Sequence, residues 1–325
     1  MAYEEISKVH KVLGKLIEER FEVRGKITRE FAAQNGIQLR DIASGNLDPK
    51  TMLELNRYTS NIMGEERIKK IPSDIKIDQF NIGNIAAEWI SAPGVNEDKV
   101  FLNLFGGGYI MSTFKGSRLI LYQISRATHL RCLSIKYRLA PENPFPAALN
   151  DSIEAYKWLL SNGFDPKKIF IGGQSAGGGL AVATMLKLRE LNLPLPAGAV
   201  LMSAWADLTG SGKSIIENQK FEPLIKEGLV NMARLYAQEE PLSNPLISPV
   251  FADLKGLPPL LIQAGSIEAL VDDSNFLADG AKKAGVEVEL EIYENMTHVF
   301  QSFGEDLPES MKAFERIGQF IQKII

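Results

Sequence analysis

The sequence predicts an α/β protein with a mostly parallel central sheet that is covered by helices on both faces. Short apolar runs of strand length follow one another along the chain, at residues 99–105, 131–137, 168–174, 197–204, 259–265 and 286–292. Helix-length segments separate most of these runs, at residues 116–128, 148–162, 175–191 and 272–284. Strands that alternate with helices form βαβ units, which place their strands parallel. Two further strands are expected at residues 75–82 and 85–90, where apolar residues alternate or cluster.

The first 72 residues are expected to be helical. Residues 4–21 predict one amphipathic helix, because apolar residues recur every three to four positions, at Ile6, Val9, Leu13, Leu16, Ile17 and Phe21. Residues 22–70 indicate further short helices joined by polar turns such as that at 44–50. The apolar face of the first helix requires a partner, which is the rest of the protein, a partner subunit or a lipid surface. Its mixed acidic and basic polar face makes lipid the weakest of these options.

The composition and net charge of the chain exclude some classes of function. The chain has 325 residues, of which 45% are hydrophobic and 23% are charged, so it can bury a large core. Its net charge is −4 with interspersed signs, so it lacks a basic stripe and nucleic-acid binding is not expected. No signal-peptide pattern or membrane-spanning stretch is visible, so we expect a cytoplasmic protein without stable membrane insertion. The single cysteine, Cys132, lies in an apolar run and is expected to be a buried, inert thiol.

A serine nucleophile is predicted at Ser175. The segment Gly173-Gln174-Ser175-Ala176-Gly177 fits the pattern G-x-S-x-G, directly after a predicted strand and directly before a predicted helix. Small neighbours permit a sharp turn that holds the serine in a strained conformation. The turn also places the hydroxyl at a helix N-terminus, where N–H groups stabilise developing negative charge.

His298 is the predicted base. A serine hydroxyl needs a neighbouring base, and the chain has only three histidines, His10, His129 and His298. His10 belongs to the N-terminal helix and His129 lies between a helix and a strand, so both are interpreted as surface or packing residues. His298 follows the strand at 286–292, in a polar loop. It therefore comes last, after the serine, as the chain order of this motif requires.

Three carboxylates could orient the histidine. Glu268, Asp272 and Asp273 all follow the predicted strand at 259–265. Glu268 lies in the loop just past the carboxyl end of that strand, where sites on parallel sheets form. Asp272 and Asp273 lie where the next helix begins, and acidic residues there usually cap the helix. We therefore favour Glu268 over Asp272.

An oxyanion hole is predicted after an early strand. Phe105 is followed by Gly106, Gly107, Gly108 and Tyr109. Glycines let the backbone approach a ligand closely, so their N–H groups can point at a developing negative charge, together with the N–H of Ala176.

These motifs together resemble the bacterial hormone-sensitive-lipase-like carboxylesterases of the α/β-hydrolase superfamily. The resemblance covers residues 99–303 and rests on FGGGY at 105–109, YRLAPENPFPAALND at 137–151, GGQSAGG at 172–178, SAWADLTGS at 203–211, AGSIEALVDD from Ala264 and MTHVF at 296–300. It implies an α/β-hydrolase fold, with a helical cap at residues 1–72 and a catalytic domain at 73–325 in which an insertion at 207–249 contributes to the cap.

The resemblance also implies a site and a chemistry. Ser175, Glu268 and His298 form the expected triad, and Gly107, Gly108 and Ala176 are the expected oxyanion donors. No cofactor and no metal are implied, and homodimers are frequent in the family. The chain departs from the family pattern in three places: Phe105 replaces a histidine, Gln174 replaces an acidic residue, and Glu268 replaces an aspartate. With Phe105, the glycine loop must be held by packing or by other polar contacts.

The expected function is hydrolysis of small-molecule esters through an acyl-enzyme, and the resemblance implies acyl groups of short to medium chain length. Two alternatives stay open at this point. One is hydrolysis of a lactone or an acetylated natural product, and the other is a small-molecule binding protein on the same fold. The presence of His298 argues against the binding protein.

Overall fold

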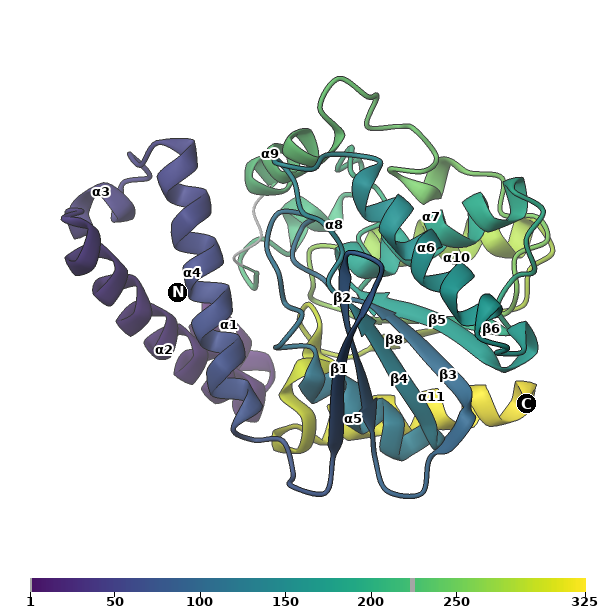
Figure 1. Cartoon of the computed structure of the whole chain (residues 1–325). Coiled ribbons are helices and arrows are strands. Elements are labelled where there is room, and N and C mark those ends of the chain that lie inside the picture. Colours follow the sequence, from purple (N-terminus) through teal and green to yellow (C-terminus); the bar gives the residue numbers. More distant parts are fainter. Residues whose placement is uncertain (1, 223–225) are drawn as a thin grey trace.

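A single eight-stranded sheet organises the chain in the computed structural model, which describes residues 2–222 and 226–325 (Figure 1). The strand order is β1-β2-β4-β3-β5-β6-β7-β8. The strands are β1 (Lys76–Ile82), β2 (Ile85–Ser91), β3 (Asn96–Leu104), β4 (Leu130–Ile135), β5 (Ile169–Gln174), β6 (Gly198–Met202), β7 (Leu260–Gly265) and β8 (Val288–Tyr293). Strand β2 pairs antiparallel with β1 and β4, and the other pairs are parallel. The prediction of a mostly parallel sheet is confirmed.

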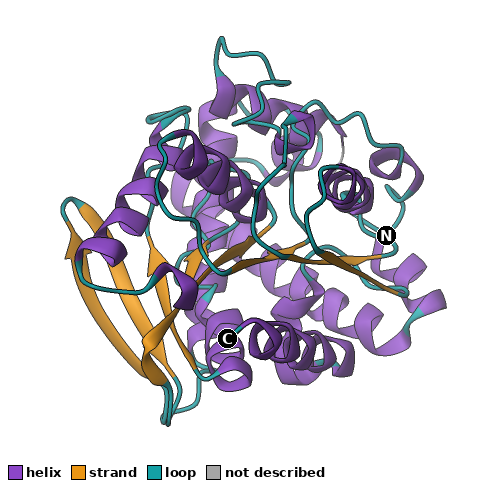
Figure 2. Cartoon of the chain, turned by 90° about the vertical axis from the view of Figure 1, so that its right-hand side faces the viewer, coloured by secondary structure: helices purple, strands orange, loops and turns teal. Residues whose placement is uncertain are grey.

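Helices cover both faces of the sheet (Figure 2). One face carries α5 (Arg118–Thr128) and α11 (Pro308–Ile324), and the other carries α6 (Ala147–Ser161), α7 (Ala176–Glu190) and α10 (Val271–Lys283). Successive residues of β3 alternate between the two cores: Phe101 packs with α5 and α11, whereas Leu102 packs with α6 and α7. Central strands therefore need apolar residues on both faces, which explains the continuous apolar runs in the sequence.

The N-terminal helices differ from the predicted pattern. The expected helix over residues 4–21 is divided into α1 (Ala2–Val9) and α2 (Lys11–Asn35). The division occurs at His10, whose extended backbone ends α1 and whose Nδ1 accepts the N–H of Leu13 at 3.1 Å, which caps α2. The prediction of only short helices over residues 22–70 is also wrong. Two long helices, α2 and α4 (Pro49–Ile68), flank the short α3 (Leu39–Ala43), because residues 22–35 are mostly good helix formers without proline.

The apolar face of these first helices packs on the rest of the protein. Ile6 and Leu13 are fully buried in one cluster with Phe300, Phe303 and Leu307, which precede α11. Of the three partners considered for this face, the chain itself is therefore the one observed.

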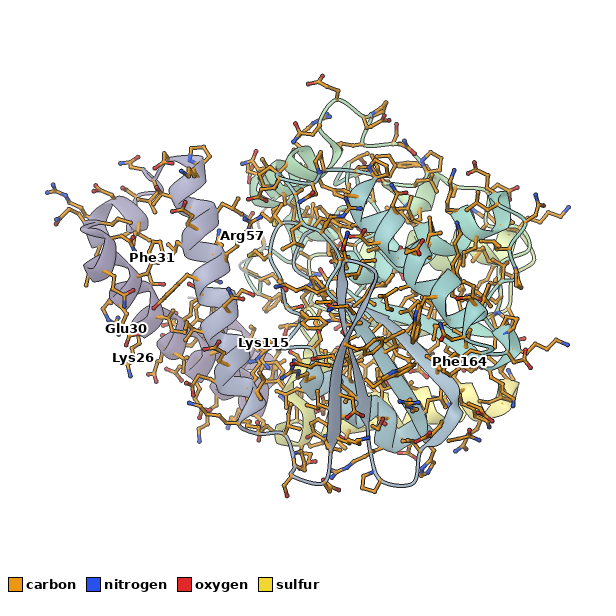
Figure 3. The ribbon with its side chains drawn as sticks, viewed as in Figure 1. Lys26, Glu30, Phe31, Arg57, Lys115 and Phe164 are labelled. Carbon is orange, nitrogen blue, oxygen red and sulfur yellow. The ribbon has the colours of Figure 1, made fainter. Side chains whose placement is uncertain are left out.

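Polar contacts join α4 to the sheet domain. Arg57 points from α4 toward that domain in Figure 3 and donates to the carbonyls of Ile110 and Ala140, at 2.8 Å each. It also forms a two-pronged ion pair with Glu142 at 2.7 and 2.8 Å. A second ion pair joins Lys115 to Glu65 at 3.2 Å. These contacts fix α4 beside the edge of the sheet where the predicted site residues lie.

The segment 207–249 contains the helices α8 (Ser214–Glu217) and α9 (Lys226–Ala237), and residues 223–225 of it lie outside the described residues. The described part of the chain also contains three short 3-10 helices, η1 (Pro166–Lys168), η2 (Pro249–Phe251) and η3 (Phe300–Asp306). No helix among the described residues has both the length and the apolar character to cross a bilayer.

Candidate active site

Ser175 lies at the turn between β5 and α7, with φ 55° and ψ −125°. This left-handed conformation is strained for a residue with a side chain. It is held on both sides, since the N–H of Ser175 donates to the carbonyl of Met202 at 2.9 Å and its carbonyl accepts from Trp205 at 2.9 Å. Close packing explains the neighbouring glycines: a Cβ at Gly177 would lie 1.9 Å from the Leu104 carbonyl oxygen.

His298 lies in the loop that follows β8, and two side chains hold its backbone. Its N–H donates to Oε1 of Glu222 at 2.8 Å. The next N–H, of Val299, donates to Oγ of Ser203 at 3.0 Å, and Val299 itself is left-handed with φ 50°. The loop is therefore fixed by contacts from two distant segments of the chain.

Glu268 is fully buried, with one carboxylate oxygen directed at the histidine. Its Oε2 accepts the Ser203 hydroxyl at 2.7 Å and the Gly265 N–H at 2.9 Å. Its Oε1 lies 3.9 Å from Nδ1 of His298, which is an ion-pair distance rather than a hydrogen bond. Neither of these two atoms has another hydrogen-bond partner among the described residues. Such contacts often tighten when substrate binds.

Nearby carboxylates change the pKa of His298. Burial alone would lower the pKa of its imidazole, but the nearby carboxylates of Glu268 and Glu222 outweigh burial and raise the pKa above its ordinary value. The imidazolium form is thus stabilised. A base that takes a proton from a serine passes through that form.

The two aspartates near Glu268 contact the backbone of another segment. Oδ2 of Asp273 accepts the N–H groups of Ala206 and Asp207, at 2.9 and 2.8 Å. Oδ2 of Asp272 accepts the N–H of Ser214 at 3.0 Å. Both aspartates lie in the first turn of α10, and they tie that helix to the start of the segment 207–249.

The glycine loop presents free N–H groups next to Ser175. Gly107 has φ 120° and Gly108 has φ 62°, conformations that favour glycine. Among the described residues, no acceptor takes the N–H of Gly107, Gly108 or Ala176. Ala176 is the first residue of α7, where an N–H has no partner within the helix. The three residues that the sequence predicts as oxyanion donors therefore have N–H groups without an acceptor among the described residues.

An aromatic pair, Phe105 and Tyr137, anchors the start of the glycine loop, where the family pattern has a histidine. The Tyr137 hydroxyl donates to the Phe105 carbonyl at 2.7 Å, and the two rings stack with centroids 4.0 Å apart and planes at 7°. Thr113 donates to the Gly106 carbonyl at 3.1 Å. Gln174, in place of an acidic residue, donates to the Ser117 hydroxyl at 2.7 Å. Neutral hydrogen bonds and packing thus hold the loop.

Ser175, His298 and the glycine loop line one cavity of about 270 Å³. Trp205, Leu229 and Met232 give it apolar walls, and Arg67 of α4 adds one charged side chain. The structure thus brings the predicted nucleophile, base and oxyanion donors together, with Glu268 behind the base. Within the described residues, no group of three histidine, cysteine or acidic side chains is arranged to hold a metal ion.

Sequence reasoning missed three side chains of this region, Ser203, Glu222 and Arg67. Ser203 bridges Glu268 and the backbone after His298, and Glu222 holds the backbone of His298 itself. Ser203 lies in the segment SAWADLTGS, which supports the family resemblance but assigns no chemical role to this serine. Glu222 and Arg67 carry no pattern of their own, because their positions depend on contacts with residues far away in the chain.

Comparison with known proteins gives consistent matches. Residues 101–302 match a family model described as the α/β hydrolase fold. An acetyl-hydrolase of Streptomyces hygroscopicus is 37% identical over 285 residues, which cover 84% of this chain and 94% of that protein. An esterase of Acinetobacter venetianus is 33% identical, with 76% and 82% covered. Among solved structures, an esterase from the bacterial hormone-sensitive lipase family superimposes with a TM-score of 0.83 at 41% identity, covering 95% of this chain and 98% of that one.

Proposed function

Since the chain belongs to the bacterial hormone-sensitive-lipase-like carboxylesterases of the α/β-hydrolase superfamily and is an esterase, we propose that it cleaves its esters through a Ser175–His298–Glu268 triad. One observation carries this proposal. A serine in a strained left-handed turn at a helix N-terminus shares a small cavity with His298, whose ring has the buried Glu268 carboxylate behind it.

In the proposed reaction, Ser175 Oγ attacks the ester carbonyl while His298 takes its proton. The N–H groups of Gly107, Gly108 and Ala176 bind the oxyanion of the tetrahedral intermediate, and one such donor changes kcat by roughly 10²–10³-fold. Glu268 stabilises the imidazolium. The intermediate collapses as the C–O bond breaks and His298 protonates the leaving alcohol. Water, deprotonated by His298, then attacks the acyl carbon; the bond to Ser175 Oγ breaks, His298 returns the proton to that oxygen, and the acid leaves.

The substrate is proposed to carry a short- to medium-chain acyl group. A cavity of about 270 Å³ is slightly smaller than the usual range for small-molecule sites, which begins at roughly 300 Å³. A relative named acetyl-hydrolase is consistent with a small acyl group. We also propose residues 1–72 as a cap over the site, with 207–249 contributing, because Arg67 of α4 and Leu229 and Met232 of α9 line the cavity.

Covalent labelling tests the nucleophile directly. A fluorophosphonate should label the protein stoichiometrically, with the modified peptide containing Ser175. Ser175→Ala should abolish both labelling and hydrolysis of 4-nitrophenyl acetate, while Ser161→Ala, at an exposed position at the end of α6, should change neither. Unchanged turnover in Ser175→Ala would refute the triad. A protein that folds but resists labelling would instead be a binding protein on this fold.

A series of 4-nitrophenyl esters with acyl chains from acetyl to dodecanoyl tests the proposed chain length. The value of kcat/KM should be highest at or below the middle of the series and fall for the longest chains. A maximum at dodecanoyl would overturn the size argument while leaving the triad untouched.

A further inference from the structure

A second cavity lies directly beside the Ser175 cavity. It has a volume of about 340 Å³ and lies between the helices α2 and α4 and the segment 302–306. In Figure 1 these helices stand against one side of the sheet domain. Arg67 and Ser302 line both cavities, so their side chains form the boundary between them. A ligand in the second cavity is therefore adjacent to a substrate at Ser175.

Two guanidinium groups face this second cavity without a carboxylate partner. Among the described residues, neither Arg20 nor Arg67 forms an ion pair, and the Arg67 side chain makes no hydrogen bond. Arg20 donates to the hydroxyl and carbonyl oxygens of Ser302, at 3.2 and 2.9 Å, and lies over the Phe303 ring at 3.3 Å. Arg20 is thus held in position by neutral groups, and Arg67 is free to receive an anion.

Four acidic residues line this cavity, Glu19, Glu66, Glu305 and Asp306, and among the described residues none of them forms an ion pair with Arg20 or Arg67. Asp306 pairs with Lys70 at 2.8 Å and Glu66 with Lys69 at 2.7 Å. Glu305 accepts from Gln123 at 3.2 Å. The carboxyl side chains of Asp306 and Glu66 are at least half exposed, so water screens them.

The placement of the two arginines is unfavourable in the absence of an anion. Burial lowers the pKa of both guanidinium groups, and the charge of Arg67 lowers the pKa of Arg20 further, while the charge of Asp306 partly offsets this at Arg20 only. A partly buried cation normally has a counter-ion, because the loss of hydration is otherwise uncompensated. An anion between the arginines and Ser175 would supply that missing partner.

We propose that Arg67, supported by Arg20, binds a carboxylate group of the substrate, so that the enzyme prefers esters that carry a negative charge. The inference rests on the proposed function, since it places the scissile carbonyl at Ser175. A planar guanidinium binds a carboxylate through two parallel hydrogen bonds, which fixes both charge and orientation.

Matched ester pairs test this preference. On the alcohol side, 4-acetoxybenzoate is compared with 4-acetoxybenzamide, and on the acyl side monoethyl glutarate is compared with ethyl 4-carbamoylbutanoate. Each pair exchanges a carboxylate for a neutral amide of similar size. In at least one pair, the wild-type protein should show a kcat/KM roughly ten- to hundredfold higher for the carboxylate, as expected for a hydrogen-bonded charge pair. Added salt should reduce this ratio.

Arg67→Gln should remove the preference, bringing kcat/KM for the carboxylate ester to within about threefold of its neutral partner, mainly through KM. Arg29→Gln is the matched control, because it removes one positive charge from an exposed position of α2 that lines neither cavity; both substrates should react as in the wild type. The melting temperature of Arg67→Gln should not fall, whereas a purely structural arginine would lower it when replaced.

The outcomes separate the two proposals. If the neutral esters are hydrolysed in a Ser175-dependent way but no pair shows a charge preference, or the preference survives in Arg67→Gln, the carboxylate site is wrong and the esterase mechanism stands. If Ser175→Ala retains the turnover, the mechanism itself is wrong.

Discussion

Replacing Glu222 with glutamine should change how stability depends on pH. Glu222 is 5% exposed, and burial raises the pKa of its carboxyl from 4.5 to about 7; the charge and the backbone N–H of His298 oppose that rise and the charge of Glu268 adds to it. The folded protein therefore holds this proton more tightly than the unfolded chain. Stability is lost as the pH rises from about 4.5 to about 7. At ~1.4 kcal/mol for each tenfold change in proton affinity, the loss is about 3 kcal/mol.

Glu222→Gln removes this loss, because an amide oxygen can still accept the His298 N–H but carries no charge. At pH 8 the variant should be more stable than the wild type by up to about 3 kcal/mol. At pH 4 the two should agree within ~0.5 kcal/mol, since the carboxyl is then protonated in both states. Urea unfolding followed by circular dichroism at pH 4, 6 and 8 measures the difference.

Glu227→Gln is the control, because Glu227 is an exposed carboxylate on α9 in the same segment of the chain. It should leave the stability difference near zero at every pH. A difference between Glu222→Gln and the wild type that stays constant from pH 4 to pH 8 would show that the carboxyl of Glu222 titrates normally, and the reasoning would be refuted.

The same substitution should shift the activity profile. The Glu222 charge contributes to the raised pKa of His298. Without it the imidazole loses its proton at a lower pH, so the acidic limb of kcat/KM should move to lower pH in Glu222→Gln. A limb that stays in place or moves upward would contradict the electrostatic coupling of the two residues.

Three further substitutions test the frame of the site. Gly177→Ala would place a Cβ 1.9 Å from the Leu104 carbonyl oxygen, so it should destabilise the fold by about 1–3 kcal/mol or more and abolish activity, measured by thermal unfolding and ester hydrolysis. Gly25→Ala, within α2 and with only an arginine side chain nearby, should instead stabilise by ~0.5–1 kcal/mol, and a loss of stability there would argue against α2. Tyr137→Phe keeps the ring stack but leaves the buried Phe105 carbonyl without its 2.7 Å donor; we expect a loss of ~1–3 kcal/mol and a lower kcat, and an unchanged kcat would mean that the loop is held otherwise.

The sheet and the placement of the motifs could be predicted from the sequence for a definite physical reason. Parallel strands are buried on both faces, so they appear as continuous apolar runs that stand out from the helices between them. Their carboxyl ends meet at one edge, and Ser175, Glu268 and His298 each follow such an end. Their positions just after these strands therefore predict that the three residues lie at the same edge of the sheet.

Contacts between distant segments could not be predicted in this way. The end of α1 at His10 depends on a side chain that caps the next helix, and the apolar periodicity continues through it. Glu222 and Arg67 lie in segments whose local pattern is that of an ordinary polar loop and an ordinary helix. Their roles depend on the fold, which places Glu222 against the backbone of His298 and Arg67 at the Ser175 cavity.

The departure at Phe105 shows which property of the glycine loop is constrained by the proposed chemistry. The proposed oxyanion donors are backbone N–H groups, so the proposed chemistry needs a fixed loop backbone rather than a particular side chain at its start. The Tyr137 hydroxyl donates to the Phe105 carbonyl, and the two rings stack. Tyr137 thus holds the loop from a different segment of the chain. At Gly107 no such substitution is available, because φ is 120° and a Cβ would lie 2.2 Å from the Met111 carbonyl oxygen. The side chain that anchors the loop can therefore vary, whereas the glycine that forms it cannot.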